Sequence, residues 1–262
     1  RVLALTDRFT LAQAVQQANA SHPALAHGMG RSYGDVCLNP QGQLWSTTGL
    51  NKFIHFDPQT GQLTAEAGVL LHDIQHTFVP QGWMLPVTPG TQFVTLGGAI
   101  ANDVHGKNHH VMGTFGEHVV GLELRRTDGT CLHLSRTKHA DWLHATIGGL
   151  GLTGLITQAT VVLRKVNSAW LDVQTMAYQN LDAFFDLADG SEADWEYTVS
   201  WVDCLSGRDV RGIFMRANHP SLETVQAAGL DEAPRAASKR QVPGVPPVSL
   251  VNALSLRAFN TA

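Results

Sequence analysis

The fold is decided by one glycine-rich stretch, Pro86-Val-Thr-Pro-Gly90-Thr, continued by Thr95-Leu-Gly-Gly-Ala-Ile-Ala-Asn102-Asp-Val-His105-Gly-Lys107-Asn-His-His110 and closed by Gly113-Thr-Phe-Gly116-Glu-His118. Its glycines and prolines exclude a long helix, because glycine serves positions of positive φ or close backbone approach. Successive backbone N–H groups in such turns form concave anion sites, which bind phosphates above all. The stretch therefore predicts a phosphate-bearing cofactor held mainly by backbone, with a reactive pocket at its Lys107 end.

Composition describes a globular chain with one large domain or two ordinary ones. The chain has 262 residues, 44% of them hydrophobic and 15% charged, with a net charge of -4. No basic stripe stands out, which argues against nucleic acid as the main partner. No apolar run reaches about 18 residues, and no signal peptide is visible after Arg1. We therefore expect a cytoplasmic protein, or one peripheral to the inner membrane.

Cysteines and histidines do not predict a metal site. Cys37, Cys131 and Cys204 are too few and too scattered for a disulfide framework or a zinc site. A local histidine cluster lacks both helical spacing and cysteine or carboxylate partners; it consists of His105, His109, His110 and His118. We expect thiols in a reducing compartment and no metal.

Outward from the central stretch, the pattern predicts an α+β fold with hairpins rather than βαβ repeats. On the N-terminal side we expect a helix capped by Thr10, a strand at 24–26, a glycine-rich loop at His27–Asp35, a hairpin over 53–67 and a helix over 70–78. On the C-terminal side we expect strands at 119–126 and 131–134 joined by Asp128-Gly129, a helix over 141–147 and a strand over 155–163.

A composition shift near 165–168 predicts a domain boundary. We expect a domain over 1–167 and a second, antiparallel-sheet domain over 168–262. The second should contain strands at 169–177, 197–204 and 210–216, a helix at 181–187, a mobile loop at 219–247 and a short helix within 249–259. Its sheet looks incomplete, so a truncated domain is expected.

Two glycine motifs can be tested by their context. Gly149-Leu-Gly151-Leu-Thr-Gly154 imitates a dinucleotide fingerprint, but a helix precedes it and a strand follows, the reverse of the order that a Rossmann site needs. The loop at His27–Asp35 does follow a strand, so the N–H groups of Met29 to Tyr33 could face a pyrophosphate beside Arg31. A tight turn with an exposed arginine explains the same loop, and both interpretations stay open.

Two side chains likewise admit two interpretations from the residues alone. Lys107 fits a solvated loop lysine as well as a catalytic cation. Trp201 lies on an alternating strand, where most aromatic residues belong to the core, although a wall of a substrate pocket is also possible.

The combined motifs resemble the vanillyl-alcohol-oxidase-type (PCMH) family of FAD-dependent oxidoreductases. The resemblance is carried by Gly28-Met-Gly30-Arg31-Ser32-Tyr33-Gly34-Asp35, Pro89-Gly90-Thr91, residues 95–110, Gly148–Gly154 and Tyr197-Thr-Val-Ser-Trp201-Val-Asp203. It extends over nearly the whole chain up to about Arg216. His105-Gly-Lys107-Asn-His-His110 is similar to the branch of the family that oxidises polyprenylphosphoryl-ribose.

The resemblance implies an FAD-binding PCMH-type domain over 1–167 and a substrate-binding domain over 168–262. Implied FAD contacts are Ala26, His27, Gly28, Met29, Gly30, Arg31, Ser32, Tyr33, Gly34, Asp35, Val36, Gly90, Thr95, Leu96, Gly97, Gly98, Asn102, Asp103, Val104, His105 and Ile156. Tyr33, Lys107 and Trp201 would face the substrate, with Lys107 and His105 in catalytic positions.

Departures from the family pattern carry chemical meaning. Many relatives have a flavin-linked histidine where this chain has Arg31, so the FAD is expected to be non-covalent. A basic residue and an active-site cysteine that the family carries in a later segment have no counterpart here, and Cys204 does not fill that role.

The implied reaction is oxidation of a secondary sugar alcohol to a ketone at C2′ of a polyprenylphosphoryl-ribose, the first half of an epimerisation in cell-wall arabinan precursor synthesis. A short-chain NAD-dependent reductase would be the partner, and membrane contact would be peripheral, through the lipid substrate. The alternatives are an aldonolactone or alditol oxidase or dehydrogenase of the same fold, and a flavin-binding module without turnover.

Overall fold

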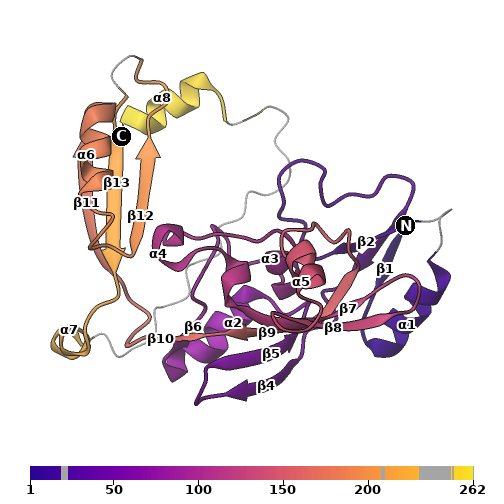
Figure 1. The fold of residues 1–262 in the computed structure, drawn as a ribbon. Helices are drawn as coiled ribbons and strands as arrows, with labels where there is room; N and C mark the ends of the chain where they lie inside the picture. The colour runs from indigo at the N-terminus through magenta and orange to yellow at the C-terminus, as the bar shows by residue number, and fades with distance from the viewer. Residues whose placement is uncertain (19–22, 208–209, 230–248, 250, 262) are drawn as a thin grey trace. The chain divides into compact units, whose positions relative to one another are not determined.

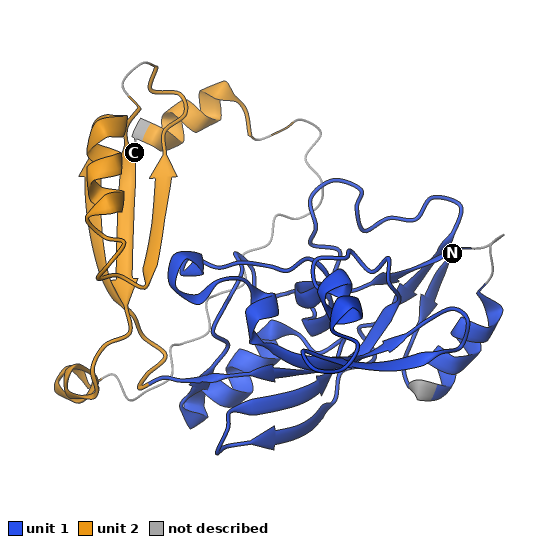
Figure 2. Ribbon diagram, in the orientation of Figure 1, with its two compact units in different colours: residues 1–166 blue, residues 167–262 orange. Residues whose placement is uncertain are grey.

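The computed structural model describes residues 1–18, 23–207, 210–229, 249 and 251–261. The chain divides into two compact units, Arg1–Val166 and Asn167–Ala262 (Figure 2). The division falls at the composition shift found in the sequence. Each unit is described by itself, and the assignment of the second to substrate binding stays a prediction.

The first unit begins with a small parallel sheet, which the sequence did not predict. Its order is β1-β3-β2, with β1 at Val2–Ala4, β2 at Ala24–His27 and β3 at Gln43–Ser46 (Figure 1). Helix α1 (Arg8–Gln17) follows β1, and a small core around Leu11 and Trp45 lies between helix and sheet. Both pairings in this sheet are parallel, whereas the sequence pattern predicted hairpins rather than βαβ repeats for the fold.

The N-cap of helix α1 lies three residues before the predicted one. Asp7, not Thr10, is the N-cap residue, and its carboxylate accepts hydrogen bonds from the backbone N–H groups of Phe9 and Thr10. The Thr10 hydroxyl accepts in return from the Asp7 N–H, which completes a capping box. The hydrogen bonds from the Thr10 N–H and hydroxyl, and from the Phe9 N–H, lower the pKa of Asp7 below its ordinary value.

The main sheet of the first unit is antiparallel and five-stranded, in the order β4-β5-β9-β7-β8. Its strands are β4 (Phe53–Asp57), β5 (Gln62–Glu66), β7 (Val119–Arg125), β8 (Cys131–Ser135) and β9 (Leu155–Val162). The expected hairpins β4–β5 and β7–β8 are both present. A two-stranded pair, β6 (Trp83–Met84) with β10 (Arg164–Lys165), ends the unit.

Short helices and 3₁₀ turns, separated by loops, lie between the strands of this sheet along the chain. They are α2 (Leu71–Phe78) with a 3₁₀ turn η1 (Val79–Gln81), α3 (Leu96–Ala101), α4 (His109–Met112), the 3₁₀ turn η2 (Phe115–His118) and α5 (Ala140–Thr146). The central stretch thus forms only helical pieces of six residues or fewer, as its glycines predicted. Leu63, Ile74, Leu96 and Ile100 are fully buried in the core between α2, α3 and the sheet.

The second unit is a three-stranded antiparallel sheet, β11-β13-β12, with helices. Its elements are β11 (Asp172–Tyr178), α6 (Leu181–Asp189), β12 (Tyr197–Val202), β13 (Gly212–Asn218), α7 (Leu222–Ala228) and α8 (Ala253–Thr261). Phe184 of α6 packs against Tyr178 and Phe214, so α6 covers one face of the sheet.

One expectation for this unit is partly wrong, and another falls on residues that the structure does not describe. The region 219–247 was expected to be a mobile loop, but residues 222–228 form α7, capped by the Ser221 hydroxyl accepting from the Thr224 N–H. Residues 230–248 lie outside the described part of the chain, as does any completion of the sheet there. The mixed helix and sheet content agrees with the α+β expectation.

Replacing Ile74 with Ala tests the core of the first unit. Ile74 is 0% exposed, so we expect the free energy of unfolding to fall by about 2–5 kcal/mol. Ile54, at 48% exposure on β4, is the matched control, and Ile54→Ala should cost less than about 1 kcal/mol. Urea unfolding of the flavin-loaded protein measures both. Equal losses in the two variants would contradict this account of the core.

Candidate cofactor and substrate site

The first glycine-rich loop leaves β2 with its backbone donors unused. Within the described residues, the N–H groups of Met29 to Tyr33 donate no hydrogen bond. Gly30 and Gly34 adopt φ of 61° and 65°, values that residues other than glycine rarely adopt. The loop thus presents a row of backbone donors that suits an anion such as a pyrophosphate.

This loop lies directly against the central stretch. A Cβ on Gly28 would overlap Thr95 Oγ1, so only glycine allows the approach. Farther along the loop, the Ser32 hydroxyl donates to Asn102 Oδ1 at 3.4 Å. Two segments about 70 residues apart in sequence therefore form one surface, as the cofactor hypothesis requires.

Helix α3 fixes the far side of that surface. Thr95 is its N-cap, with Oγ1 accepting from the Gly98 N–H at 3.0 Å. The N–H groups of Leu96 and Gly97 donate to the carbonyls of Val69 and Ala67. The start of α3 is therefore attached to the end of β5 by backbone alone, which holds Thr95 in place beneath Gly28.

The rejected fingerprint motif supplies a third segment. Helix α5 precedes it and β9 follows, the order expected from the sequence. The N–H of Gly148 donates to Ile100 O and that of Leu150 to Ala101 O. A Cβ on Gly151 would lie 3.6 Å from Leu25 of β2. Three glycine-rich segments thus converge around α3.

Asp103 connects α3 to the residues that carry the candidate chemistry. Its φ is 41°, unusual for a residue with a side chain. Asp103 Oδ1 accepts from the Gly116 N–H at 2.8 Å, and His105 pairs with Thr114 in an antiparallel bridge. The segment from 103 to 105 is therefore held against the 114–116 turn.

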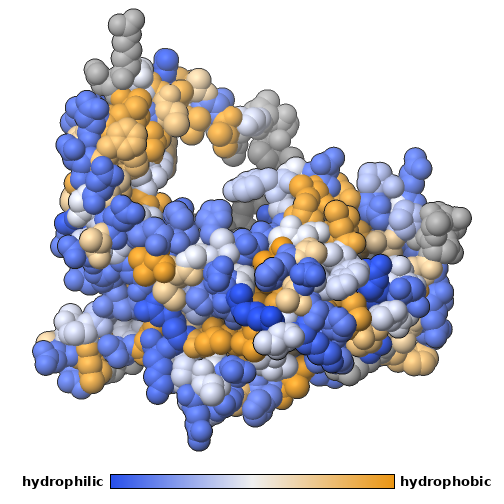
Figure 3. Space-filling model, in the orientation of Figure 1, coloured by the Kyte–Doolittle hydropathy of each residue, from blue (hydrophilic) through white to orange (hydrophobic). Residues whose placement is uncertain are grey.

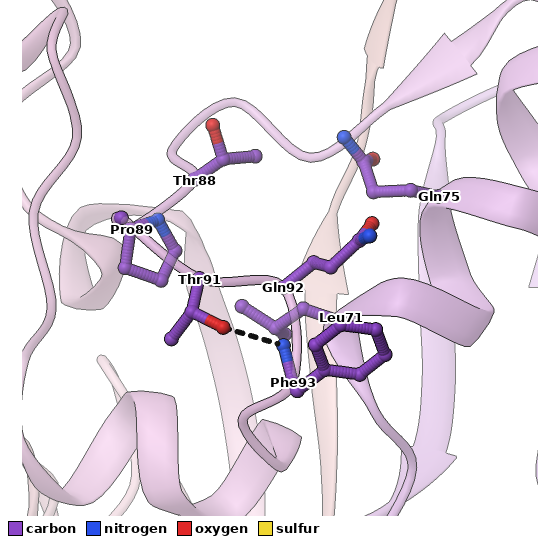
Figure 4. Close-up of a pocket in the computed structure, with 8 residues that line it drawn as sticks. Leu71, Gln75, Thr88, Pro89, Thr91, Gln92 and Phe93 are labelled. Atoms are coloured by element: carbon purple, nitrogen blue, oxygen red, sulfur yellow. Dashed lines mark hydrogen bonds between the residues drawn. The ribbon is translucent and has the colours of Figure 1, made fainter. Parts of the chain in front are cut away.

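A hollow of about 490 Å³ lies at the turn that follows Thr88 (Figure 4). It is lined by Leu71, Gln75, Thr88, Pro89, Gly90, Thr91, Gln92 and Phe93. The Phe93 N–H donates to the Thr91 hydroxyl, which fixes the turn drawn in Figure 4. A Cβ on Gly90 would meet nothing within 4 Å, so this part of the wall is open.

Asn108 ties the candidate catalytic residues to the wall of the hollow. It is 1% exposed, and its Nδ2 donates to Pro86 O at 2.9 Å. A Cβ on Gly106 would lie 2.8 Å from Thr88 O, so the loop packs closely on the lining segment. Lys107, between these two buried residues, is exposed. Lys107 is therefore an exposed residue in a loop that packs against Thr88, one of the residues lining the hollow.

The other predicted substrate residues, Tyr33 and Trp201, are described each within its own unit. Tyr33 is 97% exposed at the tip of the first loop. Trp201 lies on β12 in the second unit, where its ring packs edge-on against Phe259 of α8. Ile156, a predicted FAD contact, is 5% exposed in the sheet core. Their assigned contacts stay predictions.

Sequence reasoning missed the structural roles of Asn108 and Asp103. Asn108 reads as a polar loop residue between lysine and histidine, and nothing local shows that it is buried. Asp103 was predicted as an FAD contact, but its hydrogen bond to Gly116 also gives it a structural task. The only indication of these roles in the sequence is a carboxylate or amide side chain followed by glycine-rich turns, and this indication is weak.

A family model described as an FAD binding domain matches residues 1–135. The matched range contains both the donor-rich loop and the whole central stretch. The chain therefore belongs to this family of FAD-binding domains, and the resemblance to the vanillyl-alcohol-oxidase-type flavoproteins is confirmed. FAD is its cofactor, and the unused donors of the first loop fit its pyrophosphate.

Individual relatives refine the family placement. Decaprenylphosphoryl-beta-D-ribose oxidase of Mycolicibacterium smegmatis is 37% identical over 209 residues, 78% of this chain and 45% of that protein. L-gulonolactone oxidase of Mus musculus is 32% identical over 136 residues, 51% of this chain and 30% of that protein. D-lactate dehydrogenase of Anaerostipes hadrus is 26% identical over 146 residues. The chain spans less than half the length of the relatives it matches.

Asn108→Ala tests the link between the loop and the hollow. It leaves the buried Pro86 carbonyl without its donor, which should cost about 1–3 kcal/mol of stability and loosen Lys107. Asn39 is the matched control, because its Nδ2 also donates to a proline carbonyl, Pro23 O, at an exposed site. We expect Asn108→Ala, but not Asn39→Ala, to lower both the unfolding midpoint and turnover. Equal effects would remove Asn108 from its positioning role.

Proposed function

We propose that the chain oxidises a secondary sugar alcohol to a ketone, at C2′ of a polyprenylphosphoryl-ribose. The observation that carries the proposal is the placement of His105-Gly106-Lys107-Asn108 against the wall of the hollow, in a chain 37% identical to an oxidase of that class. The ketone would be the first product of an epimerisation. A short-chain NAD-dependent reductase would complete it.

The residues proposed to hold the cofactor are those of the converging glycine segments. Residues 26–36 would receive the pyrophosphate through the N–H groups of Met29 to Tyr33. Gly90, the start of α3, and residues 102–105 would receive the remainder. When bound, FAD supplies the acceptor for the hydride that leaves the carbinol carbon.

Lys107 is proposed to stabilise negative charge on the substrate. As the hydroxyl loses its proton, charge develops on the alcohol oxygen, and an ammonium close by stabilises it as a point charge. The same ammonium could instead meet the lipid phosphate. His105 is proposed to orient the flavin, since it follows the cofactor segment directly and its backbone is paired with Thr114.

The second unit is proposed to bind the lipid part of the substrate. Trp201 lies opposite Ile213 in the β12–β13 register, on the sheet face away from α6. Ile213 is 40% exposed and Val173 53%, and apolar side chains are visible on the surface of this unit (Figure 3). Such a face suits a polyprenyl chain. Among the described residues, no helix is long and apolar enough to cross a bilayer.

Arg31 makes the mode of flavin attachment testable. Its guanidinium donates to Met29 O at 3.2 Å and offers no nucleophile to the flavin. Acid precipitation should therefore release the yellow cofactor into the supernatant, and an absorption spectrum of both fractions measures the partition. Yellow colour retained in the washed pellet would show a covalent link and contradict the proposal.

Anaerobic flavin reduction tests the substrate and Lys107 together. Polyprenylphosphoryl-ribose should bleach the flavin of the wild-type protein, while free ribose, an aldonolactone and an alditol should not. Lys107→Ala should slow bleaching by about 10²-fold or more and leave the flavin spectrum intact. Lys138→Ala, which removes an exposed lysine of the turn after β8, should bleach at the wild-type rate.

Each failure has its own meaning in that experiment. Bleaching by the aldonolactone or alditol would replace the proposed substrate class while keeping the oxidase. A flavoprotein that none of the compounds bleaches would be a binding module without turnover. Normal bleaching by Lys107→Ala would remove Lys107 from the mechanism.

A further inference from the structure

The β7–β8 hairpin brings a carboxylate, a thiol and an imidazole together on one sheet face. Glu123 of β7 lies directly opposite His133 of β8, and Arg125 opposite Cys131. Because side chains two residues apart on a strand share a face, Cys131 and His133 point the same way. One potential ligand atom from each of Glu123, Cys131 and His133 lies within 4.8 Å of the others.

The carboxylate of this group is held in a fixed position. Glu123 is 6% exposed, and its Oε1 accepts from the Thr157 hydroxyl at 2.7 Å and from Arg125 Nε at 3.3 Å. Hydrogen bonds of this kind orient a metal-ligating carboxylate and are common around metal sites. Of the other two side chains, Cys131 is half-buried and His133 is exposed.

These three side chains match the ligands of a zinc ion. Carboxylate oxygen, thiolate sulfur and imidazole nitrogen all bind Zn²⁺, and three protein ligands leave a fourth tetrahedral position open. Around tetrahedral zinc, sulfur and nitrogen ligands lie about 3.5 Å apart. The three ligand atoms lie within 4.8 Å of one another, so any separation that exceeds that distance between ligands would have to shorten when an ion binds. We propose that Glu123, Cys131 and His133 form a zinc site.

The surroundings suit a structural ion. A hollow of about 220 Å³ lies beside Glu123 and Thr157, with Leu11 and Val15 of α1 on its other side. An ion bound to both strands would fasten the β7–β8 hairpin next to the packing surface of α1. Arg125 carries a positive charge that repels the ion, so its hydrogen bond to Glu123 would have to be given up on binding; its side chain is 34% exposed.

The spacing along the sequence conceals this arrangement. Cys131 and His133 form only a two-ligand motif, and Glu123 precedes them across the Asp128-Gly129 turn. The expectation of no metal rested on cysteine spacing and on the histidines of 105–118. Cross-strand pairing in the hairpin was not part of that reasoning.

Cobalt titration of the flavin-loaded, tag-free, chelator-treated protein tests the site. One equivalent of Co²⁺ should produce a thiolate-to-cobalt charge-transfer band. It should also produce tetrahedral d–d bands at wavelengths longer than those that the flavin absorbs. Zn²⁺ should displace the cobalt and abolish both kinds of band. Cys131→Ser should lose the charge-transfer band, and His133→Ala should weaken binding at least about 10-fold. Because ligand protons are released, binding should weaken as pH falls.

Matched variants separate this site from other thiols and histidines. Cys204→Ser removes an exposed thiol of the second unit, and His144→Ala an exposed imidazole of α5; both should bind cobalt like the wild type. His133 is exposed, so His133→Ala should retain bound flavin, which reports an intact fold. A wild type without the thiolate band, or a band that persists in Cys131→Ser, would overturn the proposal. Cobalt binding without that band would show that other histidines bind the metal, and this result would also overturn the proposal.

Discussion

The close approach of Gly28 to Thr95 is the contact on which the first unit depends. There is no room for a side chain between the two segments, since a Cβ on Gly28 would overlap the Thr95 hydroxyl. That hydroxyl is also the N-cap of α3, so one oxygen both starts the helix and defines how near the first loop can come. The parallel sheet and the five-stranded sheet are thereby joined at their loops.

In the rest of the candidate site, backbone N–H groups are either paired within the chain or exposed. Around α3, the donors of residues 96, 97, 148 and 150 are paired with carbonyls of neighbouring segments. The donors of Met29 to Tyr33 have no such partner among the described residues, and their pairing with a ligand stays a prediction. Asp103 and Asn108 then connect this framework to the 114–116 turn and to Pro86. Lys107 is exposed between two buried residues, Gly106 and Asn108.

Local chemistry made part of this architecture predictable. Asp128-Gly129 between alternating runs defined the β7–β8 hairpin, and the glycines of 86–118 excluded a long helix. The reversed order of helix and strand around Gly149–Gly154 was enough to remove the Rossmann alternative. Likewise, the composition shift near 165–168 marked the division between the units. The glycine loops indicated a phosphate site, and family resemblance extended that to FAD.

What the sequence concealed depends on contacts distant along the chain. The pairing of β3 between β1 and β2 joins three strands of three or four residues, too short to show a period. Thr10 looked like a cap because Asp7 and Thr10 are both good N-cap residues, and only geometry distinguishes N-cap from N3. Burial of Asn108 follows from packing on Pro86 and Thr88, which no local pattern records.

The unpaired donors of the first loop make folding and cofactor supply parts of one equilibrium. A ligand that binds only the folded chain stabilises it by mass action, in proportion to the logarithm of its free concentration. Among the described residues, the N–H groups of Met29 to Tyr33 have no acceptor, and bound FAD would supply one. The free energy of unfolding should therefore rise with the concentration of free FAD, and chains without the cofactor should populate open states more often.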